Sequence, residues 1–189
     1  MTKGQTDFDV TTRVLHLGLA VFGTAAWWLG DDADDYHKAV HDGYTLHMCA
    51  GLGFSLFLAL RIGYGVFGPA EQRFANWMPF TRERLAAAWA DIRGLCQRRL
   101  PPPLSHRGLS GAIQGIGLVL FTWQGASGSL MSLTLTPGER ATGWVHDIKE
   151  VHGLGGNWIP AYLALHVGAM LLHSFAGHPI WKKMIFVGK

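Results

Sequence analysis

Four long apolar segments limit the fold of this chain more than any other feature of its sequence. They cover about residues 14–30, 44–65, 108–131 and 152–175. Each approaches the ~20 residues that an α-helix needs to cross a bilayer, and a helix satisfies its own backbone hydrogen bonds in lipid. Only 15% of the 189 residues are charged, whereas about 25% is usual in soluble domains. The sequence therefore predicts an all-α integral membrane protein, a four-helix transmembrane bundle with these segments as its spans.

Basic residues gather on one side of these spans. The connection over residues 61–107 holds eight Arg and three acidic residues, and further Lys and Arg residues, among them Lys3 and Lys189, precede the first span and follow the last. The first connection is acidic instead, with Asp31, Asp32, Asp34 and Asp35. Because basic connections stay on the cytoplasmic side of a membrane, we predict that both termini and the middle connection lie in the cytoplasm.

The middle connection contains a segment with helical periodicity. Its apolar residues recur at helical spacing among arginines, at Leu85, Trp89, Ile92 and Leu95. This pattern predicts an amphipathic helix over about 81–99 that lies on the inner membrane surface, with its basic residues against anionic lipid. No motif for nucleic acid accompanies it, so membrane lipid is the predicted partner.

Four histidines lie inside the apolar segments, where an imidazole is costly without a partner. They are His16, His47, His152 and His166. His152 and His166 are close to four turns apart, roughly 21 Å along one helix at 1.5 Å per residue. The predicted orientation places His47 and His152 near the outer surface, and His16 and His166 deeper toward the cytoplasm. Since imidazole is a common axial ligand of haem iron, we predict two haems, the outer held by His47 and His152 and the inner by His16 and His166.

Each of these residues also has a simpler interpretation. A lone histidine in a span can hydrogen-bond a neighbouring helix and do nothing more, although four at two matched depths favour ligation. Glycines lie on the same helix faces and leave room for a flat macrocycle, at Gly43, Gly51, Gly155 and Gly156. Ordinary packing of small residues between membrane helices explains these glycines equally well. A zinc or copper site needs ligands clustered at one depth, whereas the histidines here divide between two levels.

Three further residues are candidates for contacts with a cofactor. Arg13 and Arg61 stand at the cytoplasmic ends of their spans, where they can pair with the propionates of the inner haem. The charge bias of inner loops accounts for both arginines equally well. His173 lies about two turns beyond His166 and is a candidate spare haem ligand, propionate contact or proton donor to a quinone.

Several short motifs in the chain are characteristic when they are taken together. They are Thr12-Arg13-Val-Leu-His16, Leu60-Arg61 with Phe67-Gly-Pro69, Glu150-Val-His152, Leu165-His166, Leu172-His173 and Trp181-Lys-Lys-Met184. Together they resemble the bacterial cytochrome b561 family, which includes the cytochrome b subunits of nickel-iron hydrogenases. The resemblance covers nearly the whole chain. The chain departs from the common pattern at Phe8 and Leu17, where the family often has tryptophan.

The resemblance implies a single di-haem transmembrane cytochrome b domain over residues 1–189, in the bacterial inner membrane. It implies ligation of two b-type haems by the same four histidines, and electron exchange with the quinone pool. We expect an electron-transfer subunit whose redox partner is a periplasmic c-type cytochrome or a hydrogenase-like enzyme. Two alternatives remain at this stage: a stand-alone superoxide:quinone oxidoreductase, and a non-redox haem or metal carrier.

Overall fold

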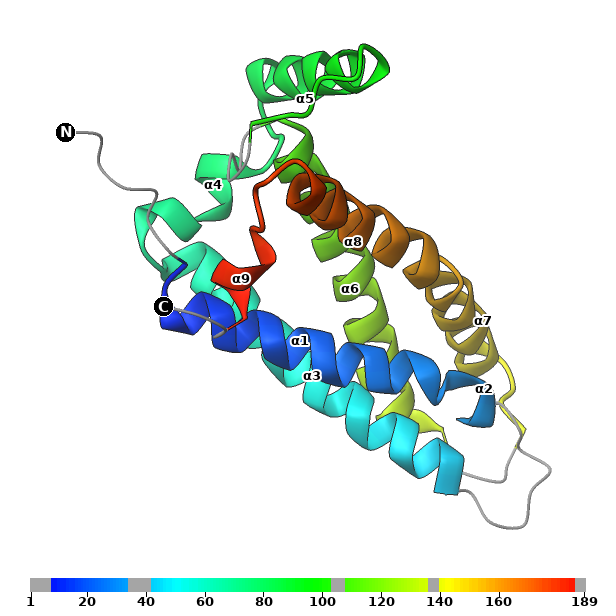
Figure 1. The fold of residues 1–189 in the computed structure, drawn as a ribbon. Helices are drawn as coiled ribbons and strands as arrows, with labels where there is room; N and C mark the ends of the chain where they lie inside the picture. Colours follow the sequence, from blue (N-terminus) through cyan, green and yellow to red (C-terminus); the bar gives the residue numbers. More distant parts are fainter. Residues whose placement is uncertain (1–7, 34–41, 103–107, 136–139, 186–189) are drawn as a thin grey trace. The chain divides into compact units, whose positions relative to one another are not determined.

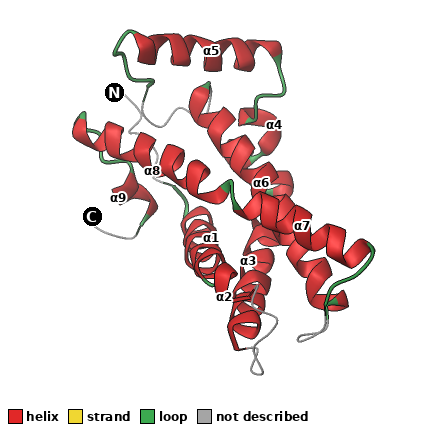
Figure 2. Ribbon diagram, turned by 90° about the vertical axis from the view of Figure 1, so that its right-hand side faces the viewer, coloured by secondary structure: helices red, strands yellow, loops and turns green. Residues whose placement is uncertain are grey.

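The regular structure of this protein is helical. A computed structural model describes residues 8–33, 42–102, 108–135 and 140–185, and these ranges contain helices and no strand (Figures 1 and 2). The elements in order are α1 (Val10–Trp28), α2 (Gly30–Ala33), α3 (Asp42–Phe67), η1 (Ala70–Gln72), α4 (Phe74–Trp77), α5 (Arg82–Cys96), α6 (Leu109–Thr134), α7 (Trp144–Gly156), α8 (Ile159–Phe175) and α9 (Trp181–Met184). The predicted all-α class is confirmed. Lys3, Lys189, Asp34 and Asp35, used above to orient the chain, lie outside the described residues.

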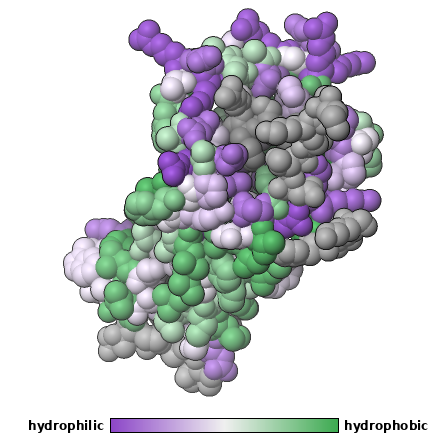
Figure 3. Space-filling view, turned by 90° about the vertical axis from the view of Figure 1, so that its left-hand side faces the viewer, coloured by the Kyte–Doolittle hydropathy of each residue, from purple (hydrophilic) through white to green (hydrophobic). Residues whose placement is uncertain are grey.

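Three stretches of helix among the described residues are long and apolar enough to cross a membrane. They are α3, α6 and the α7–α8 stretch Trp144–Phe175. Large apolar side chains on these stretches stay exposed, with Leu133 83% and Phe175 86% accessible, as expected of surfaces that face lipid. Figure 3 shows a broad hydrophobic area on the face that it draws. Helix α1 does not join this group, because its 19 residues include the polar Arg13 and His16, and its role as a fourth span stays a prediction.

The amphipathic segment of the middle connection forms α5. Thr81 caps its N-terminus by accepting a hydrogen bond from the Arg84 backbone N–H at 3.3 Å, which satisfies one of the free donors of the first turn. The helix ends before Arg98, whose φ of +59° is left-handed. The apolar residues of the predicted stripe remain exposed, with Leu85 at 54% and Trp89 at 58%. The helix thus has an uncovered apolar side, as an interfacial helix requires.

The segment that carries His152 and His166 is interrupted. The prediction of one continuous helix between these histidines is wrong, because α7 ends at Gly156 and α8 begins at Ile159. Glycine is a poor helix former and three of them close α7, while proline at position 160 has no N–H to continue the helical hydrogen bonds. Helix α7 also begins at Trp144, ahead of the predicted start of this span near residue 152.

The described chain packs as two compact units. Unit 1 contains Met1–Val14, Arg61–Leu118 and Tyr162–Lys189, and unit 2 contains Leu15–Leu60 and Val119–Ala161. In unit 2, parts of α1, α3, α6 and α7 pack together, and the core includes Leu15, Phe54, Leu58 and Leu120. Close approach of α1 and α3 depends on Gly18 and Gly53, where a Cβ atom would overlap the rings of Phe57 and Phe22 respectively.

Unit 1 is held together by polar contacts as well as by apolar burial. Asp9 precedes α1 and accepts hydrogen bonds from the backbone N–H and the hydroxyl of Thr12, at 2.8 and 2.7 Å. The Tyr64 hydroxyl, on the last part of α3, donates to the same carboxylate at 3.0 Å. Asp91 on α5 accepts from the backbone N–H of Leu109 at 2.9 Å. These carboxylates therefore join the beginning of α1 to α3, and α5 to the beginning of α6.

Candidate functional site

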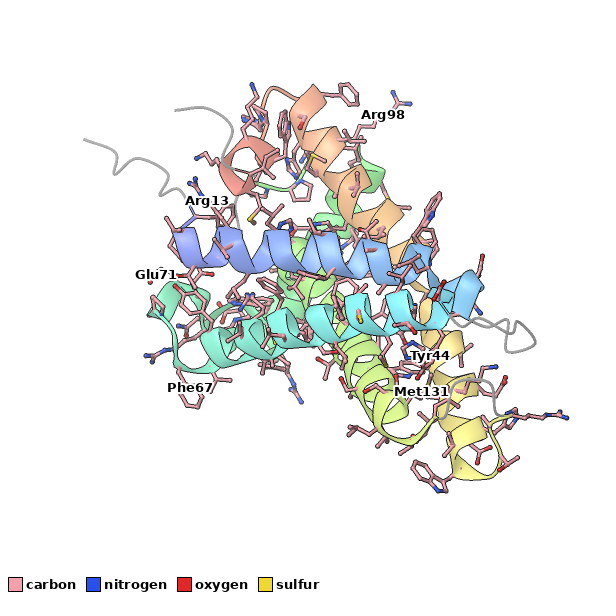
Figure 4. The ribbon with its side chains drawn as sticks, turned by 90° about the horizontal axis from the view of Figure 1, so that it is seen from below. Arg13, Tyr44, Phe67, Glu71, Arg98 and Met131 are labelled. Atoms are coloured by element: carbon pink, nitrogen blue, oxygen red, sulfur yellow. The ribbon has the colours of Figure 1, made fainter. Side chains whose placement is uncertain are left out.

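Two of the four predicted ligands lie close together in unit 2. His47 lies on the first turns of α3, shortly after Tyr44 (Figure 4), and His152 lies on α7. Their ring centroids are 6.0 Å apart and their ring planes are perpendicular. With metal–nitrogen distances of about 2.0 Å and each centroid about 1.2 Å behind its nitrogen, a metal between two imidazoles requires centroids about 6.4 Å apart, close to the observed 6.0 Å. The separation of the two rings therefore fits one metal ion between them.

The ring of His47 is held from its other side. Its Nδ1 lies 2.8 Å from the carbonyl oxygen of Ala26, on α1. Because a carbonyl oxygen only accepts, Nδ1 carries the proton and donates it to Ala26. Nε2 is then left with a lone pair, which is the state in which neutral imidazole binds a metal.

His152 is anchored in the same way by a side chain. Its Nδ1 lies 2.9 Å from the Ser127 hydroxyl oxygen on α6. That hydroxyl donates its one proton to the Trp123 carbonyl at 2.7 Å, so it accepts from His152 Nδ1–H. His152 Nε2 thus also carries a lone pair. Both histidines present the nitrogen that a metal would take, and both use the other nitrogen as an anchor.

The glycines near these histidines divide into two kinds. A Cβ atom added at Gly51, one turn beyond His47, or at Gly153, beside His152, would meet nothing within 4 Å. Gly51 therefore leaves open space on the helix face of His47, whereas Gly153 lies at the exposed surface of α7. Gly155 and Gly156 do not border such space, and for these two the alternative of ordinary helix packing holds. A Cβ atom at either position would contact the side-chain amide of Gln124 instead.

The two predicted inner ligands belong to different units. His16 lies on the part of α1 in unit 2, and His166 lies on α8 in unit 1. The His166 ring stacks on Tyr162, one turn earlier, with centroids 5.7 Å apart and planes inclined by 14°. A Cβ atom at Gly117 would overlap the Tyr162 ring, so α6 comes close to α8 at this point. The pairing of His16 with His166 stays a prediction.

The other candidate contacts are in unit 1. The Arg61 guanidinium lies over the rings of Phe74 and Trp77, 5.2 and 6.0 Å from their centroids. Its buried Nη1 has no hydrogen-bond partner in the described chain, and neither has the buried Nδ1 of His173. A buried polar nitrogen without a hydrogen-bond partner is destabilising, so each of these two nitrogens can form a further hydrogen bond to a ligand. Arg13 uses its Nε to donate to the Phe8 carbonyl at 2.8 Å.

A bare metal ion does not suit the His47–His152 site. Nowhere in the described ranges do three His, Cys, Asp or Glu side chains gather closely enough to hold a metal ion. Two imidazoles leave most coordination positions of a transition metal to other ligands. A haem would need only two ligand nitrogens from the protein, and His47 and His152 offer one each. The residues present therefore fit haem.

Two residues that contact this site were missed by sequence reasoning. Gln124 and Ser127 are polar residues within an apolar span, and they are three residues apart, hence on one helix face. A polar side chain in a membrane span is itself a signal of a specific partner. The sequence alone could therefore have singled out Gln124 and Ser127, but only the packing of unit 2 shows that they contact α7.

One comparison with known proteins finds a match. A family model described as prokaryotic cytochrome b561 matches residues 7–186. No curated protein and no solved structure matches the chain. The family match covers all four predicted ligands and every described helix.

Proposed function

The chain belongs to the prokaryotic cytochrome b561 family, and from that premise we propose that it carries electrons across the bacterial inner membrane through two b-type haems. Family membership makes it a membrane protein of haem-based electron transfer. The number of haems, their ligands, the topology and the exchange with quinone are the parts that we propose.

The outer haem is held by His47 and His152. The observation that carries this proposal is their 6.0 Å ring separation, supported by the hydrogen bonds at both Nδ1 atoms. A bound haem would supply an iron that gains and loses one electron, and with both His47 and His152 as its ligands it would serve electron transfer rather than oxygen binding. The residues of the chain bind and orient the group and determine its surroundings.

The inner haem is held by His16 and His166. Arg61 and Arg13 are the proposed contacts of its propionates, and the buried unpaired Nη1 of Arg61 supports this role for Arg61. His173, with its unpaired buried Nδ1, is the proposed contact for a quinone or for the haem itself. Held by these residues, the inner haem would exchange electrons with quinone, and the outer group held by His47 and His152 would connect that exchange to the opposite face.

The proposed topology has four spans in one domain over residues 1–189, with α1 as the first span and both termini in the cytoplasm. Helix α5 lies on the inner membrane surface. Its exposed apolar residues support this position, as do the arginines at 82, 84 and 93 on the same helix, because basic residues are attracted to anionic lipid.

The proposed redox partner is a periplasmic c-type cytochrome or a hydrogenase-like enzyme, which makes the protein an electron-transfer subunit. A haem or metal carrier needs ligands that exchange readily, whereas both outer histidines are anchored at Nδ1. No observation favours the superoxide:quinone oxidoreductase over the subunit.

The test is the haem content of the purified full-length chain. A pyridine haemochrome assay with a reduced-minus-oxidised spectrum is expected to show two b-type haems per chain, both reducible by a quinol analogue. One haem per chain contradicts the second site, and no haem overturns the proposed function. Reduction by dithionite but not by quinol contradicts the quinone assignment alone.

A further inference from the structure

Helix α6 contributes none of the predicted haem ligands, yet two of its side chains contact the turn of α7 that carries His152. Ser127 contacts the ring of His152, and Gln124 contacts the backbone around it. Both contacts lie within unit 2. Among the described residues the anchor of His47 is not a side chain, since its Nδ1 donates to the main-chain carbonyl of Ala26.

The Ser127 contact is one link in a short chain of hydrogen bonds. His152 Nδ1–H donates to the Ser127 oxygen at 2.9 Å, and the Ser127 hydroxyl donates to the Trp123 carbonyl at 2.7 Å. The serine hydroxyl is therefore held in one direction by its own helix. A Cβ atom at Gly128 would stand 3.1 Å from Cε1 of the same ring, so α6 also limits the ring sterically.

The Gln124 contact acts on the backbone of α7. With its nitrogen directed at His152, the Gln124 amide donates to the His152 carbonyl at 3.0 Å and accepts from the Gly156 N–H at 3.1 Å. Residues 152 and 156 are four apart, so these two groups are ordinarily partners of each other in an α-helix. Gln124 thus binds both groups of one helical hydrogen bond, in the turn where α7 ends. Gly155 leaves the space that the amide occupies.

We propose that Ser127 and Gln124 are positioning residues for His152, through which α6 determines the reduction potential of the outer haem. Ser127 holds the tautomer and rotation of the ring, and Gln124 holds the backbone that carries it. This inference rests on the proposed function. It goes beyond it by assigning the adjustable axial ligand to His152, because a side-chain substitution can remove its anchor but not the Ala26 carbonyl behind His47.

The expected effect of losing Ser127 has a definite sign. An acceptor at Nδ1–H makes the opposite nitrogen a stronger electron donor, which favours ferric over ferrous iron. Ser127→Ala removes the acceptor and is expected to raise the midpoint potential of one haem. When the solution potential is set to the wild-type midpoint potential, more than half of that haem in the variant is then expected to be ferrous. The affinity of that site for haem is expected to fall by about 10–100-fold, as is usual when such an anchor is lost.

The experiment is a potentiometric titration of the full chain with both haems bound, together with its ferric electron paramagnetic resonance spectrum. Ser132→Ala is the matched control for Ser127→Ala, because Ser132 is on the same helix and donates only to the Ser129 carbonyl among the described contacts. Gln124→Leu is compared with Gln114→Leu, since the Gln114 amide donates to Ser110 on α6 itself. Both test variants are expected to move one titration wave and one low-spin signal, and both controls to leave them in place.

If the Ser127→Ala protein does not fold, conservative substitutions of Ser127 still test the proposal. Ser127→Thr retains a hydroxyl and is expected to restore the wild-type potential, whereas Ser127→Cys offers a weaker acceptor and is expected to give a smaller rise. Equal potentials in Ser127→Cys, Ser127→Thr and the wild type overturn the role of Ser127. A Gln124→Leu protein with wild-type potential and spectrum overturns the role of Gln124. A wild-type chain without haem is a different result, which refutes the proposed function first.

Discussion

The imidazole of His47 on α3 lies beside the imidazole of His152 on α7, with 6.0 Å between ring centroids and perpendicular planes. Each ring is tethered at Nδ1, one to Ala26 and the other to Ser127. Two neutral imidazoles left to pack together in an apolar core gain little from this arrangement. A metal bound by both Nε2 atoms would give each lone pair a partner.

Removing a ligand is expected to remove one haem. His47→Ala or His152→Ala leaves one b-type haem per chain by haemochrome assay, because a single axial imidazole and open space hold haem weakly. His16→Ala or His166→Ala is expected to remove the other haem. His146→Ala serves as the control, since His146 is exposed on α7, and it is expected to retain two. If the His166→Ala protein keeps both haems, the inner ligand is His173 instead.

Filling the space beside His47 is expected to exclude the outer haem. A Cβ atom at Gly51 meets no described atom within 4 Å, so Gly51→Leu is expected to be accommodated in the apo chain and to occupy room that the macrocycle needs. Helical content by circular dichroism is expected to be unchanged, with the outer haem signal lost. Gly63→Leu, also open and on the same helix, is expected to keep the outer haem. A Gly51→Leu protein with a full outer haem contradicts the placement of the group.

Asp9 is expected to stabilise the beginning of α1. Partial burial raises the pKa of Asp9, but hydrogen bonds from Thr12 and Tyr64 outweigh it, and the net pKa lies below the usual 3.8. The carboxylate therefore stabilises the fold above about pH 4, and this contribution is lost as the pH falls through the lowered pKa. Asp9→Ala is expected to lower the free energy of unfolding by about 0.5–2 kcal/mol at pH 7, with a smaller difference from wild type in strong acid.

The measurement for Asp9 is denaturant unfolding of the detergent-solubilised protein at both pH values. Glu71→Ala is a suitable control, because Glu71 is an exposed acid on η1 (labelled in Figure 4). An Asp9→Ala protein that is destabilised no more than Glu71→Ala at pH 7 shows that the cap is not stabilising.

Arg61 is expected to influence the inner haem electrostatically. A cation near a haem favours the ferrous form, so Arg61→Gln is expected to lower the midpoint potential of the inner haem and to leave the outer one in place. Arg73→Gln is the control, since Arg73 is a nearby arginine whose Nε donates to the Gly68 carbonyl at 2.8 Å. A potentiometric titration of both variants measures the effect. Unchanged potentials in Arg61→Gln would limit the role of Arg61 to interactions within the protein, such as its packing on Phe74 and Trp77.

The helical fold and the family were predictable because the signals are local. Apolar length indicates α3, α6 and the stretch from α7 to α8, and the family is recognisable from short motifs around the histidines. The break between α7 and α8 was also readable from Gly153, Gly155, Gly156 and Pro160, but the four-turn spacing of the histidines suggested a regular helix. The helix-breaking effect of these glycines and the proline interrupts the helix despite that spacing.

The atoms that surround the ligands were not predictable in the same way. Apolar composition and the positions of the histidines are properties of each segment by itself, so they can be predicted without knowing how the helices pack. The Ala26 carbonyl behind His47, the Ser127 hydroxyl behind His152 and the Gln124 amide at the end of α7 come from other helices. Which side chains meet depends on how each helix is rotated and how deeply its side chains interlock, and these are settled when the helices bury their surfaces against one another. Gly155 shows the difference: the same missing side chain suggested room for a cofactor, and in the folded protein it makes room for glutamine.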